Sequence, residues 1–307
     1  MGKLIKISAA VLLTVFALSG CAFSDPRIEG TPPPGPTVAA DFEQAADEVH
    51  AAWNAVANLA ASTGSQQWGS MADTLASQWL ILTGPDPLHR ISATDAIGDP
   101  TPDPSLGEGT SGADSALVTA RDDALTQANA STGLATAFWA GLAAGLEQVR
   151  LGLTEGYDPA TPADPTVTIT ILDEPTALSD LISQYEAGIF AIRSAMGFLA
   201  PADPDQSTFR IVLTGLQSDL SALTGMAASS EATPVGQGVF ELPPGRDSAA
   251  AMALLATTQK SLTDASMVWA ASSVDPSRAT PYLMRNAALA MDYGLGTAAW
   301  PGWPDSV

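Results

Sequence analysis

Apolar residues recur along most of the chain at the spacing of one helix face. Residues 41–62 show the repeat of an amphipathic α-helix, with apolar side chains at Phe42, Ala46, Val49, Trp53, Val56 and Ala60. A second such stretch covers residues 66–84, where Gly84 and the following Pro85 stop the pattern. Two more helices fit residues 114–130 and 132–153. The first half of the chain is therefore predicted to be helical.

The second half repeats this pattern after a break. Four further helices fit residues 174–199, 206–228, 247–273 and 277–296. Between the halves, the segment "TVTITIL" alternates threonine with aliphatic residues as a strand does, but no second segment of this kind exists to pair with it. We therefore predict an all-α fold with an extended connector at residues 157–173.

Proline and glycine divide the chain into regions. Successive prolines at positions 32–34 force extended geometry, so residues 21–40 are predicted to be a Pro-rich tether. A stretch rich in Pro, Gly and Asp predicts a long loop near residues 84–113, inside an N-terminal helical region at 41–156. A helical bundle is expected at 174–304. The two helical regions form either two bundles or one bundle with an additional helical layer.

The first 20 residues have the parts of a bacterial signal peptide. Lys3 and Lys6 precede an apolar run at residues 7–18, which is too short for a spanning helix of about 20 residues. Small residues follow, and then Cys21, the only cysteine of the chain. The sequence "LSGC" resembles the lipobox of bacterial lipoproteins. That resemblance implies cleavage before Cys21 and diacylglycerol on its thiol, whereas the alternative is a plain signal peptide with an incidental cysteine.

A lipid on Cys21 would hold the protein at the membrane. Each methylene buried in the bilayer contributes about 0.8 kcal/mol, so several acyl chains give a firm anchor. We expect a lipid-anchored protein on the extracytoplasmic face of the cell membrane, with its helical body in water. The partners expected are the membrane, through the lipid, and an envelope protein that the sequence does not identify.

The charge balance excludes one class of partner. The chain has 33 acidic against 12 basic residues and a net charge of −21. Phosphate backbones and anionic headgroups repel such a chain, so we expect no binding of nucleic acid and no peripheral membrane binding by charge. Hydrophobic residues still make up 46% of the chain, which is enough for a folded core.

Several motifs of the second half resemble an uncharacterised ferritin-like domain family of actinobacterial lipoproteins. They are "LISQYEAGIFAIRSAMGFL", "LQSDLSAL", "FELPPGRDSAAAMALLATTQKSL", "YLMRNAALAMDYG" and the terminal "AAWPGWP". The resemblance covers residues 174 to about 304 and implies a four-helix bundle. Many members carry a Glu-His pair in the first helix, where this chain has Tyr185 and Glu186. Later helices also depart from the family at the positions that carry chemistry.

A ferritin-like di-metal centre takes a carboxylate from each of two helices and Glu-x-x-His from each of the other two. Residues 174–307 contain no histidine, which removes both Glu-x-x-His motifs. The apolar repeat of the first helix points Leu178, Ile182, Tyr185, Ile189, Ile192 and Met196 inward. In the next helix the inward positions are expected at Phe209, Leu213, Leu216, Leu220 and Leu223, with no metal ligand among them.

Two charged residues of the first helix lie beside its inward line. Glu186 and Arg193 fall about 80° and about 60° from the centre of that line, on the same flank. We predict that they cover the apolar seam as an ion pair or face a partner, and that neither ligates metal. The last two helices offer only neutral inward groups, namely Gln259, Thr263, Ser266, Asn286, Ala287 and Ala290. We therefore expect no cofactor and no catalytic residue.

The first half holds one other candidate site. Glu43, Asp47, His50 and Asn54 form a stripe about 80–140° from the apolar line of that helix, so we expect them to face water. Only His89, in the predicted loop "PDPLHR", could join them. A solvated acidic face is the first interpretation. The runner-up is a metal-dependent oxidoreductase built on Glu43, Asp47, His50 and His89.

Motifs of other enzyme classes are missing from the sequence. There is no GxSxG elbow and no phosphate-binding P-loop, and "GTSG" at 109–112 is predicted to lie in a loop. We therefore expect a protein that is not an enzyme but a binding or scaffolding module. A solute-binding lipoprotein is a further alternative, and it would alternate strands and helices around a two-lobed cleft.

Overall fold

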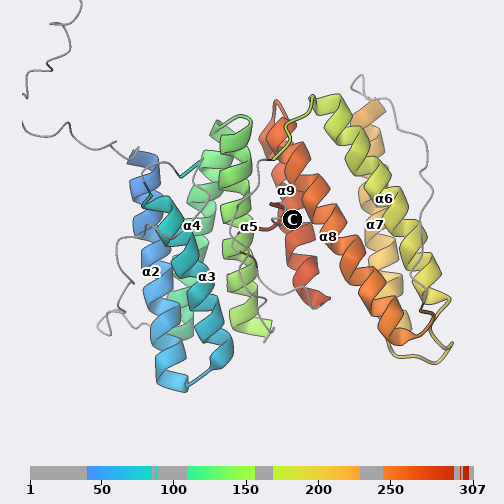
Figure 1. Ribbon diagram of the computed structural model, residues 1–307, viewed down its shortest axis with the longest axis horizontal. Helices are drawn as coiled ribbons and strands as arrows, with labels where there is room; N and C mark the ends of the chain where they lie inside the picture. Colours follow the sequence, from blue (N-terminus) through green and yellow to red (C-terminus); the bar gives the residue numbers. More distant parts are fainter. Residues whose placement is uncertain are drawn as a thin grey trace, which may run out of the picture. The chain divides into compact units, whose positions relative to one another are not determined.

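The computed structural model describes residues 40–84, 87–88, 109–155, 169–228, 245–293, 298 and 300–303. Within these ranges the fold is all-α, as predicted, and contains no strand. Its eight helices are α2 (Ala40–Thr63), α3 (Gln66–Leu82), α4 (Gly109–Ala130), α5 (Leu134–Glu155), α6 (Glu174–Met196), α7 (Asp205–Ala228), α8 (Ser248–Ser272) and α9 (Pro276–Asp292) (Figure 1). The alternating strands of the solute-binding alternative are not found there.

Several predictions fall on other parts of the chain. The signal peptide at 1–20, Cys21 and His89 lie outside the described residues, as does the Pro-rich tether apart from Ala40, which begins α2. Of the connector predicted at 157–173, only residues 169–173 are described; they belong to neither a helix nor a strand, and the backbone N–H of Leu172 donates to Ser272 Oγ at 3.0 Å. No described helix combines the length and the apolar character needed to cross a membrane.

Short polar side chains set the starts of three helices. Ser65 accepts a hydrogen bond from the backbone N–H of Trp68 at 3.3 Å and begins α3. Asp173 accepts from Thr176 N at 3.0 Å and begins α6, and Asp247 accepts from Ala250 N at 2.8 Å and begins α8. These bonds satisfy backbone donors that have no partner inside the helix.

The start of α4 corrects the sequence analysis. The prediction that "GTSG" belongs to a loop reaching residue 113 is wrong, because α4 begins at Gly109. Ala113 and Leu117 are fully buried, and they start a stripe that continues through Ala120, Ala124 and Ala128. Glycine and serine favour a loop locally, but packing of Ala113 in the core extends the helix by about one turn.

The helices pack in two groups. In the first, α2 packs on α3 and α4, and α4 packs on α5; in the second, α6 packs on α7 and α8, and α8 packs on α9. The groups meet because α5 contacts both α8 and α9, so that α9 lies between α5 and α8 (Figure 1). Val38–Val307 therefore forms one compact unit in which the two groups of helices pack against each other.

Helices α8 and α9 contribute to two apolar cores. Met267, Ala271, Leu283 and Ala287 belong to the core of α2–α5, together with Trp300 and Trp303 near the C-terminus. Trp269, Ala270, Ala279 and Tyr282 belong instead to the core of α6–α9. Because each of the two helices is apolar on two faces, neither packs fully without both groups.

Gln148 on α5 joins the two groups by hydrogen bonds. It is 2% exposed. Its Nε2 donates to the backbone oxygen of Ala287 at 2.6 Å, and its Oε1 accepts from the backbone N–H of Ala298 at 2.9 Å. Ten residues before it, the carbonyl of Phe138 accepts from Trp300 Nε1 at 3.1 Å. Helix α5 thus holds both α9 and the segment that follows it.

We predict that Gln148→Ala lowers the free energy of unfolding by about 1–3 kcal/mol, because it removes both hydrogen bonds that Gln148 makes with Ala287 and Ala298. Urea denaturation monitored by circular dichroism measures this loss. Gln217→Ala, at an exposed position of α7, is the matched control and should change stability by no more than about 0.5 kcal/mol. Equal losses in the two variants would contradict the role assigned to Gln148.

Candidate functional site

Four neutral polar side chains meet in the core of α6–α9. Tyr185 of α6, Gln259 and Ser266 of α8, and Asn286 of α9 are each at most 1% exposed. Asn286 Nδ2 donates to the Tyr185 hydroxyl at 3.1 Å and to Ser266 Oγ at 2.8 Å. Gln259 Nε2 donates to the backbone oxygen and to Oδ1 of Asn286 at 3.0 and 3.1 Å. We call these four residues the buried polar cluster, with Asn286 at its centre.

A carboxylate from α7 reaches the edge of the buried polar cluster. Asp219 is 9% exposed, and its Oδ2 accepts from the Tyr185 hydroxyl at 3.4 Å. Its Oδ1 is paired with Nη1 of Arg285, which lies one residue before Asn286 on α9. The Arg285 guanidinium also lies 5.1 Å from the centre of the Tyr282 ring. The charge of this carboxylate is thereby compensated inside the bundle.

The environment keeps Tyr185 protonated. Burial raises the pKa of its hydroxyl well above the usual value, and the negative charge of Asp219 raises it further. The hydrogen bond from Asn286 and the charge of Arg285 act in the opposite direction but are outweighed. Tyr185 therefore serves as a neutral group that donates to one neighbour and accepts from another.

The sequence analysis predicted the inward position of all four cluster residues but missed the buried carboxylate beside them. Tyr185, Gln259, Ser266 and Asn286 were predicted to face inward, and they do. The prediction that α7 presents no ligand-type side chain inward is wrong, because Asp219 is buried. The buried line of α7 runs through Phe209, Val212, Leu216, Asp219 and Leu223, whereas Leu213 and Leu220 are only half-buried. The regular spacing of three and four along this line was the available signal.

Glu186 and Arg193 lie beside the core of α6–α9, as their angular positions predicted. Glu186 is half-buried and Arg193 is exposed. No ion pair joins these two residues in the part of the chain that the structure describes. Neither residue reaches the buried polar cluster, so the cluster is built without them.

The described members of the alternative metal set, Glu43, Asp47 and His50, do not form a metal site. Glu43 and Asp47 are exposed, while the half-buried His50 ring has its centre 5.3 Å from that of Trp53 and 5.2 Å from that of Trp79. His50 Nδ1 lies 3.3 Å from the side-chain nitrogen of Asn54. Across the described ranges, no group of three or more His, Cys, Asp and Glu side chains is placed to hold a metal ion.

Asn54 corrects the expectation that this stripe faces water along its whole length. It is only 1% exposed. The reason is that α2 packs against both α3 and α4, which widens its buried sector beyond a single apolar line. The acidic end of the stripe stays solvated, and its C-terminal end is covered by the neighbouring helices.

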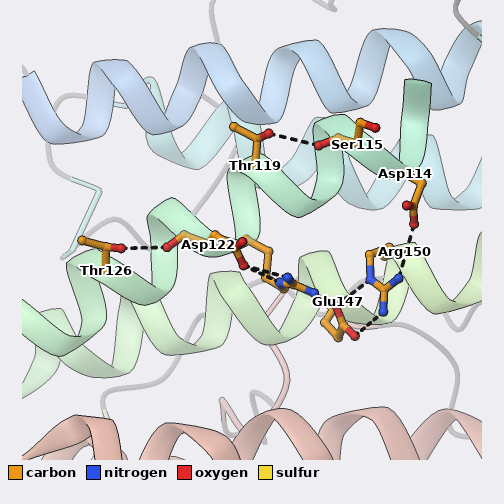
Figure 2. A network of polar contacts seen from close by, with 8 residues as sticks. Asp114, Ser115, Thr119, Asp122, Thr126, Glu147 and Arg150 are labelled. Carbon is orange, nitrogen blue, oxygen red and sulfur yellow. Dashed lines mark hydrogen bonds and ion pairs between the residues drawn. The ribbon is translucent and has the colours of Figure 1, made fainter. Parts of the chain in front are cut away.

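A second polar network ties α4 to α5 (Figure 2). Glu147 is at its centre and accepts from Arg121 Nη1 at 2.7 Å and from Arg150 Nη2 at 2.7 Å. Arg150 also reaches Asp114 at 3.3 Å, and Arg121 donates to Asp122 at 2.7 Å. Burial raises the pKa of Glu147, but hydrogen bonds from Arg150 and Arg121 and their positive charges outweigh burial and hold that pKa below its ordinary value.

A pocket of about 490 Å³ lies next to this network, between α4, α5 and α9. Helix α9 lines it with Ser277, Thr280, Pro281, Met284, Arg285 and Ala288. Helix α4 adds Arg121, Leu125 and Asn129, and α5 adds Glu147. Arg285 thus belongs to both features, because it lines the pocket and pairs with the carboxylate beside the buried polar cluster.

We predict that Glu147→Gln destabilises the fold at neutral pH and that the difference from wild type disappears in acid. The folded-state pKa of Glu147 lies below the ordinary 4.5, so its stabilising contribution is fully present above pH 4.5 and is lost as pH falls through the folded value. Urea unfolding between pH 3 and pH 7 tests this. Asp264→Asn, which removes a half-exposed pair with Lys260, should show a small difference at every pH.

Comparison of the chain with protein-family models, with curated proteins and with solved structures gives no match. The resemblance of residues 174–304 to a ferritin-like family therefore stays a prediction from the motifs.

Proposed function

We propose that this protein is an extracytoplasmic lipoprotein, anchored to the membrane through Cys21, whose helical body is a non-enzymatic binding module. The anchor is inferred from the basic residues, short apolar run and "LSGC" sequence of the first 21 residues. The binding role is inferred from the body itself. The observation that carries the binding role is the pocket between α4, α5 and α9, while the buried polar cluster argues against an oxidase.

The cluster has the wrong groups for a di-metal oxidase. Such a centre needs several anionic oxygens and imidazoles at the inward positions of four helices. Here the inward polar positions hold Tyr185, Gln259, Ser266 and Asn286, which are neutral and are linked through Asn286 by hydrogen bonds. Asp219 is compensated by Arg285, so metal binding would have to break an existing ion pair. This arrangement supports a structural role for the cluster.

The pocket offers what a binding module requires. Its volume of about 490 Å³ falls within the range of about 300–1,000 Å³ that is usual for small-molecule sites. Helices α4, α5 and α9 form its walls. Helix α5 also holds α9 in place through the hydrogen bond from Gln148 to the backbone oxygen of Ala287. A site on rigid elements binds with little loss of conformational entropy.

We further propose that α6–α9 descend from a ferritin-like bundle. In support of this, the four helices pack as one group, and their central inward positions carry polar side chains where ferritin-like proteins place metal ligands. The chain would then have kept the bundle and replaced the ligands with a neutral hydrogen-bonded cluster.

For the anchor, we expect Cys21→Ala to leave the protein in the unprocessed form or to release it from the membrane. The thiol is the acceptor of the lipid, and serine or alanine cannot replace it in that reaction. Fractionation of cells, followed by mass measurement of the mature N-terminus, provides the test. Unchanged processing and unchanged membrane retention would contradict the lipoprotein assignment.

For the body, we expect protein purified without added metal to contain much less than one iron or manganese ion per chain. Elemental analysis by mass spectrometry measures the content, and incubation with a chelator should leave the thermal midpoint unchanged. A stoichiometric transition metal, together with loss of stability on chelation, would replace the binding module with the oxidoreductase alternative.

A further inference from the structure

We propose that the pocket between α4, α5 and α9 binds a singly charged amphiphile, with its carboxylate on Arg285 and its apolar body along Leu125, Pro281, Met284 and Ala288. This inference rests on the proposed binding function and names the chemical class of the ligand. It follows from the state of the arginines in the pocket, from the character of the walls and from the charge of the whole chain.

Two arginines line the pocket, and Arg285 is the one whose guanidinium still has nitrogens without a hydrogen-bond partner among the described residues. Its Nη1 is occupied by Asp219, while Nε and Nη2 have no partner among the described residues. These two nitrogens form the side edge of the guanidinium, which fits a carboxylate with two parallel hydrogen bonds. Asp219 on one side and the Tyr282 ring on the other hold the group in place, and its side chain is 46% exposed to solvent. A ligand can therefore reach a donor pair that is already oriented.

The other charges in the pocket wall are already paired. Arg121 gives Nε and Nη2 to Asp122 and gives Nη1 to Glu147. Both oxygens of Glu147 accept hydrogen bonds, one from Arg150 alone and the other from Arg121 and Arg150. Glu147 is therefore a poor site for a ligand cation. All three guanidinium nitrogens of Arg121 already donate to carboxylates, so Arg121 is a weaker anion site than Arg285.

The walls favour an elongated apolar body behind the head group. The lining of α9 runs from Ser277 to Ala288, which at the helical rise corresponds to about 16 Å. Its middle is formed by Pro281 and Met284, and Leu125 lines the α4 side. Burying such a surface contributes about 25 cal/mol per Å² of apolar area, so an unbranched chain gains more here than a compact polar molecule.

The charge of the chain limits the head group to a small anion. A net charge of −21 repels polyanions at long range, including nucleic acids and multiply phosphorylated peptides. A single carboxylate meets less repulsion and finds the open edge of Arg285 at contact distance. A monocarboxylate with an apolar chain satisfies both the guanidinium and the apolar wall.

Titration calorimetry with decanoate tests this inference on the full-length lipidated protein in nanodiscs. Empty nanodiscs of the same lipid give the background from partitioning into the bilayer. Decanamide has the same chain without the charge and serves as the matched ligand. We expect saturable decanoate binding above the background, and decanamide binding that is weaker by about tenfold or more, since the charge-assisted bonds are missing.

Two variants separate the head site from the apolar wall. Arg285→Lys keeps a positive charge beside Asp219 but removes the planar donor edge, and Ala288→Leu fills the apolar part without changing charge. Each should weaken decanoate binding about tenfold or more. Arg278→Gln, at an exposed arginine of α9 that does not line the pocket, is the control and should bind like wild type. Thermal midpoints show whether each variant is folded.

Three results would overturn the assignment: no decanoate binding above background, equal binding of decanamide, or unchanged binding by Arg285→Lys. A negative result with metal-free protein rejects this ligand class and leaves the proposed binding module standing. A stoichiometric metal would reject the binding module whatever decanoate does, so the two failures are distinguishable.

Discussion

Helix α9 buries one face against α8 in the second core and another against α5 in the first, while a further face lines the pocket. This enclosure fixes the positions of the buried side chains of α9, including Asn286 and Ala287. Gln148 of α5 fixes the contact between α5 and α9. It donates to the backbone oxygen of Ala287 and accepts from the backbone N–H of Ala298. The buried polar cluster and the pocket both depend on this placement, because Asn286 and Arg285 are neighbours on α9.

Polar groups in the second core add specificity to its packing. An apolar seam allows one helix to slide on another, whereas Asn286 must meet Tyr185, Ser266 and Gln259 in a single register. Asp219 adds a charge that needs Arg285 as its counterion. The same ion pair orients the guanidinium that faces the pocket. The Asp219–Arg285 salt bridge therefore connects the polar groups of the second core to the proposed binding site.

The sequence by itself determined the secondary structure and much of the inward pattern. Apolar residues three and four positions apart located all eight described helices to within a few residues, apart from the early start of α4. The inward positions of Tyr185 and Gln259 followed from the same period. These features are local, and a local pattern is sufficient to encode them.

Tertiary structure alone decided which helices meet and which charges find partners. Asp219 and Arg285 are 66 positions apart, and nothing in either helix by itself indicates that they pair. Asn54 was predicted to face water because helical periodicity assigns α2 a single buried face. Contact of α2 with both α3 and α4 buries the Asn54 side chain. The pocket likewise exists only where α4, α5 and α9 converge. Helical periodicity specifies the faces of one helix, whereas burial, ion pairing and cavities depend on distances between helices, which no local pattern contains.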